Sequence, residues 1–194
     1  MQGQRARAHG RLGLRLMHGP PYKLALHPDP ILKQKAEPVT TFDEALRGLA
    51  TEMTRIRREY DGIGLAAPQA GVSLRMFVCN TDEDEEAEDV VFVNPELLEA
   101  SGDLLWDEEG CLSLPRVHGK VRRPSFVRIR AFDLEGKPFE LESSALDARV
   151  WQHEYDHLDG ILILDRMPVL DRLSNRRVLK ELESMGSGDG PAIR

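Results

Sequence analysis

The sequence has few cysteines and no long apolar run. Only Cys79 and Cys111 occur among its 194 residues, so a secreted scaffold held by disulfides is excluded and a reducing compartment is expected. No run approaches the roughly 18 apolar residues that a membrane-spanning helix needs. No internal repeat is present, and the length fits one compact domain with its own core.

An excess of positive charge is also missing. The formal net charge is −7, and the run from Asp82 to Asp89 alone contributes seven acidic residues, so the rest of the chain sums to about zero. A run of this kind is most often a solvated loop. The acidic balance argues against sequence-specific binding of nucleic acid.

We place the folded domain at residues 21–185. Residues 1–20 hold four arginines and no acidic residue. Such a start is similar to an organellar transit peptide, but it lacks serine, so a disordered basic extension is the favoured interpretation. We therefore expect a cytoplasmic protein, with organellar targeting as the alternative. Residues 186–194 are rich in glycine and are expected to form a flexible tail.

The apolar pattern predicts a mixture of helices and short strands. Thr41 to Glu44 fits a capping box, and the apolar residues from Leu46 to Tyr60 follow at helical spacing. Gly62 suits a left-handed position after this helix. Two β-hairpins are predicted, each from a pair of short runs rich in β-forming residues. These runs are 74–79 with 90–93, and 126–132 with 139–141.

Two further helices are predicted after the hairpins. One covers residues 145–158, and an amphipathic C-terminal helix includes Leu173, Leu179 and Met185. Cys79 falls within a predicted strand and is expected to be an inert core residue. Strands come first and helices flank them, which is typical of an α+β fold.

The helical segment 145–158 contains the sequence Gln152-His153-Glu154-Tyr155-Asp156-His157, an H-E-x-x-H motif. Histidines four residues apart lie on one helix face, so both can bind the same divalent metal. Glu154 is then placed to take a proton from a water on that metal. Without further context, such a pair is more often an ordinary surface pair. A catalytic metal also needs a third protein ligand.

Several residues are candidates for that third ligand. Downstream of the motif only acids are available, and Asp159 would lie nearly opposite His153 on a helix. Cys111 lies upstream in a polar segment that contains glycine, where a cysteine is a poor core residue. The side chains alone leave this choice open between Cys111, the acids and the other histidines, which are His9, His18, His27 and His118.

Three segments together resemble the signature motifs of the peptide deformylase family, in the family's order. They are Gly62-Ile63-Gly64-Leu65-Ala66-Ala67-Pro68-Gln69, Glu109-Gly110-Cys111-Leu112-Ser113 and Gln152-His153-Glu154-Tyr155-Asp156-His157. The resemblance extends from Pro28 to about Met167. It implies antiparallel β-sheets packed around a central helix that carries the H-E-x-x-H motif, with a C-terminal helix.

The resemblance also implies a reaction, the hydrolysis of the N-formyl group from the initiating methionine of new polypeptides. Cys111, His153 and His157 would hold one divalent metal ion. Family resemblance favours Fe(II), and zinc, nickel or cobalt could occupy the same site. Glu154 would act as general base and then general acid.

Further roles follow from the same resemblance. The Gln69 amide and the Leu112 backbone N–H would stabilise the oxyanion. The peptide would pair with backbone groups, and apolar side chains would line a methionine pocket. The expected substrate-binding residues are Ile63, Gly64, Gly110, Leu146 and Val150. Glu109 is interpreted as a buried partner of Arg149 or another cation. The expected partners are formyl-methionyl nascent peptides, for a monomer that associates at most transiently with the ribosome.

Two rival functions remain at this point. A zinc endoprotease would share the H-E-x-x-H motif, but it would need a third ligand downstream. A catalytically silent relative would act as a binding module, but such a relative usually loses a ligand or the acid. A weaker hypothesis is that basic residues of the C-terminal helix, such as Arg172 and Arg176, dock on ribosomal RNA. Nearby acids dilute that charge.

Overall fold

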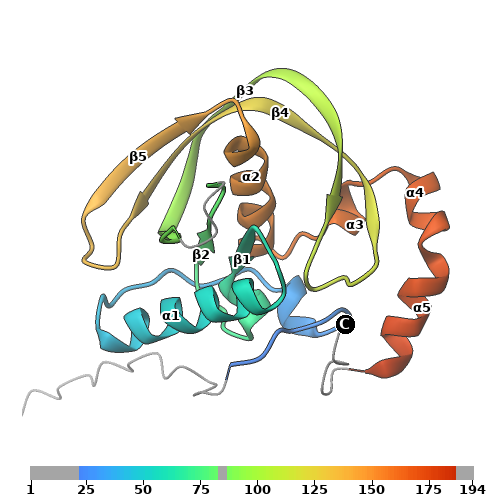
Figure 1. Ribbon diagram of the computed structural model, residues 1–194, viewed down its shortest axis with the longest axis horizontal. Helices are drawn as coiled ribbons and strands as arrows, with labels where there is room; N and C mark the ends of the chain where they lie inside the picture. The colour runs from blue at the N-terminus through green and yellow to red at the C-terminus, as the bar shows by residue number, and fades with distance from the viewer. Residues whose placement is uncertain (1–21, 83–86, 187–194) are drawn as a thin grey trace, which may run out of the picture.

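The structure, a computed structural model, describes residues 22–82 and 87–186 (Figure 1). Among these residues no helix is long and apolar enough to span a membrane. The predicted extension at 1–20 and, apart from Gly186, the predicted tail at 186–194 lie outside the described residues. The single domain over 21–185 stays a prediction. The elements are η1 (Pro30–Lys33), α1 (Glu44–Glu59), β1 (Gly64–Ala66), η2 (Ala67–Ala70), β2 (Met76–Cys79), β3 (Val90–Gly110), β4 (His118–Phe132), β5 (Pro138–Ser143), α2 (Leu146–Leu158), α3 (Ile163–Arg166), α4 (Val169–Ser174) and α5 (Arg176–Met185).

The strands form an antiparallel sheet in the order β1-β2-β3-β4-β5. It curves around α2, while α1 lies on one side and α4 and α5 lie together at the other end of the molecule (Figure 1). Both predicted hairpins are present, since Phe77 pairs with Phe92 and Ile129 pairs with Leu141. The α+β class with a central motif helix is therefore confirmed.

Helix α2 is held against the sheet by a cluster of aromatic side chains. Trp151 of α2 lies 5.8 Å from Phe92 between ring centroids, and Phe92 stacks on Phe77 at 4.5 Å. Cys79 belongs to the same buried cluster and is 3% exposed. Burial raises the pKa of its thiol, which confirms the expectation of an inert core cysteine. This packing fixes the position of the motif helix against the sheet.

Strand β3 is far longer than the predicted run 90–93. It continues to Gly110, with register shifts between Val93 and Glu96, Leu97 and Glu99, and Ser101 and Leu104. Bulges of this kind bend a strand and break its alternation of side chains. The sequence therefore lacks the regular alternation of apolar and polar residues by which a strand of this length would be predicted. The bent strand runs from the core at Val93 to Gly110, immediately before Cys111.

Two local predictions are wrong. Asp43, not Thr41, caps α1, because its carboxylate accepts a hydrogen bond from the Leu46 N–H at 3.0 Å. Asp61, not Gly62, takes the left-handed conformation after the helix, with φ of 52°. The predicted C-terminal helix is present as α5, although Leu173 belongs to the separate helix α4, which ends at the Asn175 cap.

The interpretation of residues 82–89 as a solvated loop is also wrong at one end. The Asp89 side chain is only 2% exposed and lies against Arg57 of α1. Residues 83–86 lie outside the described residues. The last residue of the acidic run is therefore part of the packed structure.

The Asp43 cap leads to a stability prediction. Replacing Asp43 with Ala should lower the free energy of unfolding by about 0.5–2 kcal/mol, because the Leu46 N–H would lose its acceptor. Thr41→Ala, the matched control two residues away, should change it by less than about 0.5 kcal/mol. Urea denaturation of both variants measures this. A larger loss for Thr41→Ala than for Asp43→Ala would contradict the assignment.

Candidate active site

Helix α2 places both histidines of the motif on one face. The Nε2 atoms of His153 and His157 lie 3.2 Å apart, and their ring planes cross at 85°. The helix ends at the Asp159 cap, and Gly160 follows with φ of 71°. A Cβ on Gly160 would lie 2.7 Å from backbone atoms of Lys33, so glycine is required there both by conformation and by space.

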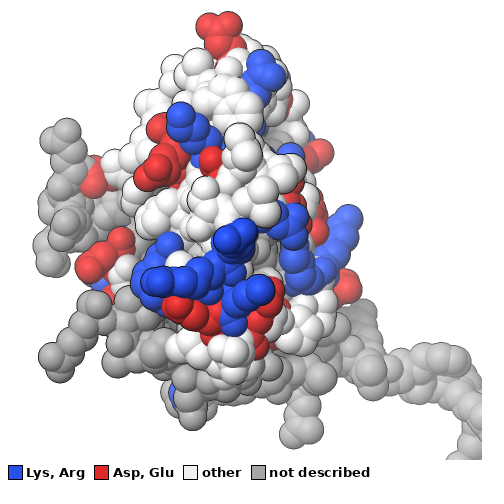
Figure 2. All heavy atoms as spheres, turned by 90° about the vertical axis from the view of Figure 1, so that its right-hand side faces the viewer, with Lys and Arg blue, Asp and Glu red and all other residues white. Residues whose placement is uncertain are grey.

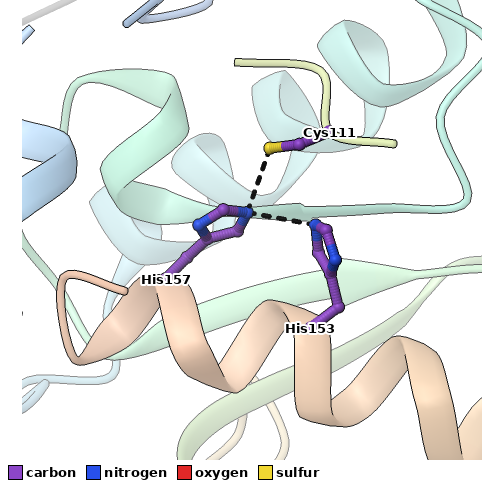
Figure 3. Close-up of side chains that lie close together, drawn as sticks. All are labelled: Cys111, His153 and His157. Carbon is purple, nitrogen blue, oxygen red and sulfur yellow. Dashed lines mark hydrogen bonds between the residues drawn. The ribbon is translucent and has the colours of Figure 1, made fainter. Parts of the chain in front are cut away.

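Cys111 reaches the histidines from the segment that follows β3. Its Sγ atom lies 3.4 Å from His157 Nε2, and all three ligand atoms lie within 4.8 Å of one another. Figure 3 shows the thiol and both imidazoles pointing toward a common centre. Cys111 is held in a turn, since its carbonyl accepts a hydrogen bond from the Leu114 N–H at 2.9 Å.

The donor set fits a divalent metal ion. In a tetrahedral site with metal–nitrogen bonds of about 2.0–2.1 Å, the two nitrogen atoms lie about 3.3 Å apart. The observed separation of 3.2 Å between the Nε2 atoms is close to that value. One thiolate and two imidazoles are also typical ligands of zinc and iron. The three residues therefore form a candidate metal site.

Glu154 lies beside this cluster and is 4% exposed. Its Oε2 atom has no hydrogen-bond partner among the residues that the structure describes. Burial raises the pKa of this carboxyl group to about 7, although the charges of His153 and Arg123 oppose the shift. A Cβ on Gly64 would overlap the carboxylate, so only glycine lets β1 pass this close. A buried carboxylate with a pKa near neutrality suits proton transfer.

The two imidazoles differ in their electrostatic surroundings. Burial lowers the pKa of His157 well below its usual value, which favours the neutral form that binds metals. Burial also acts to lower the pKa of His153, but hydrogen bonds to Cys111 and Glu109 outweigh it and raise that pKa to about 10. The Nδ1 atom of His153 lies 3.0 Å from Glu109 Oε2. Glu109 can therefore hold the ring with Nε2 directed at the candidate metal site.

Glu109 is part of a buried ionic network. Arg123 binds it through two hydrogen bonds of 2.7 and 2.9 Å and reaches Asp156 of α2 at 2.9 Å. Arg149 also donates to Glu109 at 2.6 Å, as predicted. Burial acts to raise the pKa of Glu109, but its hydrogen bonds to Arg123 and His153 hold that pKa well below its usual range. Sequence analysis missed Arg123, which lies in β4 among other basic residues without a motif.

Arg123 should contribute strongly to stability, because it joins two buried carboxylates. Arg123→Met should lower the free energy of unfolding by about 3–5 kcal/mol, because Glu109 and Asp156 would lose a buried partner. Arg130→Met on the same strand is the control, since its pair with Glu140 is 45–47% exposed and worth at most about 1 kcal/mol. Chemical denaturation of both variants measures the difference. Equal losses would contradict the importance of the buried network.

The Gln69 side chain is fixed beside the thiol. It is 1% exposed, and its Oε1 atom accepts a hydrogen bond from the Ala66 N–H at 2.8 Å. This contact leaves the amide nitrogen facing Cys111 Sγ at 3.5 Å and Ser113 Oγ at 3.2 Å. A buried amide N–H is thus presented at the candidate metal site. Leu112 follows Cys111 directly, so its backbone N–H lies in the same segment.

A cavity of about 440 Å³ opens onto these groups. Val150 is buried in its wall, while Ile63 and Leu146 are 43% and 49% exposed at its surface. Strand β1 is the terminal strand of the sheet and begins in the cavity wall. The structure brings together here all five residues expected to bind substrate, which are Ile63, Gly64, Gly110, Leu146 and Val150.

A family model for polypeptide deformylase matches residues 21–173. The chain belongs to the peptide deformylase family. One relative is a chloroplastic peptide deformylase 1B of Solanum lycopersicum, 44% identical over 83% of this chain and 59% of its own. Another is the peptide deformylase of Thermotoga neapolitana, 41% identical over 86% of this chain and 99% of its own. The chain therefore spans less than two thirds of the plant relative and nearly all of the bacterial one.

Solved structures of peptide deformylases share the fold. A peptide deformylase from Plasmodium falciparum superimposes with a TM-score of 0.81, with 38% identity over 86% of this chain and 100% of its own. A plant peptide deformylase gives a TM-score of 0.82, with 38% identity over 91% of this chain and 99% of its own. The predicted family membership is confirmed.

Proposed function

We propose that this peptide deformylase family member hydrolyses the N-formyl group from the N-terminal formyl-methionine of newly synthesised polypeptides and releases formate. The observation that carries the proposal is a cluster of one thiol and two imidazoles beside a buried carboxylate, with Cys111, His153 and Glu154 of this group in the wall of one cavity. Hydrogen bonds hold His153 through Glu109 and Cys111 through the Leu114 N–H, which is the preorganisation that catalysis requires.

Cys111, His153 and His157 would hold a single divalent ion. Such an ion supplies Lewis-acid chemistry, because it makes water acidic and polarises a carbonyl oxygen. We propose Fe(II) as the native ion, with zinc, nickel or cobalt able to replace it. Elemental analysis of protein prepared without oxygen tests this choice, because affinity order alone does not favour iron.

Glu154 would accept the proton of the attacking water and deliver it to the departing amine. Its raised pKa, about 7, lets it take both roles near neutral pH. The Gln69 amide and the Leu112 N–H would donate hydrogen bonds to the oxyanion that forms at the formyl carbon. Support for Gln69 comes from its bond to Ala66, which fixes the direction of the amide.

The substrate backbone would pair with the terminal strand β1 and with Gly110 on the opposite wall. Ile63, Gly64 and Gly110 would supply backbone groups, and Leu146 and Val150 would contact the methionine side chain. Pairing through backbone groups reads little sequence. The enzyme would therefore select its substrates mainly by the first residue, which would let it process many different polypeptides.

The cellular setting is also a proposal. We propose a monomeric cytoplasmic enzyme that meets the ribosome transiently. Three plant relatives carry chloroplastic in their names, so an organelle is the alternative location. Lys and Arg gather on the face that carries α4 and α5, interspersed with Asp and Glu (Figure 2). Fluorescent tagging of the full chain tests the location, and cosedimentation with ribosomes tests the encounter.

One assay separates the proposed function from its rivals. The metal-loaded protein should release formate from formyl-Met-Ala-Ser and leave the peptide bonds intact. Cleavage of internal peptide bonds would instead indicate an endoprotease. Binding of the peptide without formate release would indicate a catalytically silent binding module.

A further inference from the structure

Arg57 is a buried residue of α1 whose side chain contacts the end of the acidic run at Asp89 and the cavity wall at Gly62. Its side chain is 8% exposed and that of its partner Asp89 is 2% exposed. The guanidinium donates two hydrogen bonds to the Asp89 carboxylate, at 2.7 and 2.8 Å. This bidentate geometry fixes the plane of the guanidinium group.

The remaining amino group of Arg57 points at the substrate-binding segment. Its Nη1 atom donates to the Gly62 carbonyl oxygen at 2.7 Å, and the Gly62 N–H returns a bond to the Arg57 carbonyl at 2.9 Å. Gly62 is therefore held through both its carbonyl and its N–H. Thr54 adds a hydrogen bond of 3.1 Å to Asp89, so α1 holds both members of the pair.

Gly62 has little freedom on its other side. A Cβ there would lie 2.6 Å from Leu112 Cδ1, and two residues later Gly64 lies directly against Glu154. Residues 62–64 thus form a narrow strip between Arg57 and the groups proposed to perform the reaction. A shift of this strip would move the backbone groups that face the cavity.

We propose that the Arg57–Asp89 pair is a clamp that positions the strip Gly62–Gly64 for pairing with the peptide substrate. Both are positioning residues, since neither lines the cavity. The inference rests on the proposed function. It also gives the end of the acidic run a role, because Asp89 sets the orientation of Arg57.

The clamp predicts a loss in substrate binding rather than in chemistry. In Arg57→Met, the KM for formyl-Met-Ala-Ser should rise on the order of tenfold, since a charge-assisted hydrogen bond to the strip is lost. The kcat at saturation should change little. Formyl-methionine has no peptide beyond its first residue to pair with the strip, so its kcat/KM should also change little.

Hydrogen exchange of the unliganded full chain supplies a second measurement that does not depend on turnover. Amides 62–66 should exchange faster in Arg57→Met than in the unaltered protein, while amides of α2 should not. Asp89→Asn preserves the side-chain volume and should give the same pattern in weaker form, which covers the case in which Arg57→Met fails to fold. Arg55→Met is the matched control, because Arg55 lies on the same helix in exposed pairs with Glu52 and Glu59.

The possible results distinguish a clamp from a general effect on stability. An unchanged KM with unchanged exchange at 62–66 overturns the clamp. An equal loss of kcat/KM for both substrates, with exchange raised throughout the chain, also overturns it and assigns the pair to overall stability. Absence of formate release by the unaltered protein would instead refute the proposed function, and the exchange experiment would still test the clamp.

Discussion

Glu154→Gln should lower kcat for formate release by about 100-fold to 10,000-fold, the usual range for a lost general acid–base group. The buried carboxylate has an oxygen without a hydrogen-bond partner among the described residues, so it can face a reacting water. Glutamine keeps the volume that fits against Gly64 but cannot accept the proton. The effect should therefore fall on kcat, with metal content and thermal stability close to those of the unaltered protein.

The comparison that makes this result informative is Glu142→Gln. Glu142 is an exposed glutamate on β5, so the same chemical change there should leave kcat unaltered. Steady-state kinetics with formyl-Met-Ala-Ser, together with elemental analysis, measures both variants. If Glu154→Gln retained near-normal turnover with a full metal complement, Glu154 could not be the proton carrier.

The sequence predicts the parts of this site that depend on local spacing. His153, Glu154 and His157 fall on one helical turn, and helix α2 begins and ends close to the predicted 145–158. The pairing of β4 with β5 was also predictable, because a short turn joins two β-rich runs. In each case, residues close in sequence determine the geometry.

Features that depend on distant residues were not predictable in the same way. The importance of Arg123 depends on its contacts with Glu109 and Asp156. These residues lie 14 positions before it and 33 positions after it in the sequence. The α1 cap was misassigned because Thr41 and Asp43 are both good capping residues, and backbone geometry decides between them. Asp89 cannot be told apart in the sequence from the other acids of its run, because its partner Arg57 lies 32 residues away.

Cys111 stands between these two cases. Its side chain alone left several possible ligands open, and the resemblance to the peptide deformylase family selected it. The fold supplies a physical reason for that choice. Strand β3 is bent by three register shifts, and it ends where the next residue faces the two histidines. The third ligand therefore comes from a strand that the sequence pattern did not reveal.

Cys111→Ser should remove most of the bound metal and, with it, most of the activity. Losing a partner that only orients a metal ligand already costs about 10–100-fold in metal affinity. Loss of a direct ligand should cost on the order of 100-fold or more, because a serine hydroxyl is not ionised at neutral pH as a thiolate can be. The folded structure should persist, since Cys111 is only partly buried at the edge of the core.

Cys79→Ala provides the matched control, because it removes the other thiol, which is not part of the candidate metal site. Cys79 is buried in the cluster behind α2, so its loss should cost some stability but leave the metal content unchanged. Metal analysis after dialysis against a weak chelator, with formate release measured in parallel, compares the two variants. A full metal complement and an unchanged rate in Cys111→Ser would remove Cys111 from the ligand set and return the third position to the acids or the remaining histidines. Metal loss in both variants would instead mean that the thiols act through stability, whereas loss in Cys111→Ser alone is what direct ligation requires.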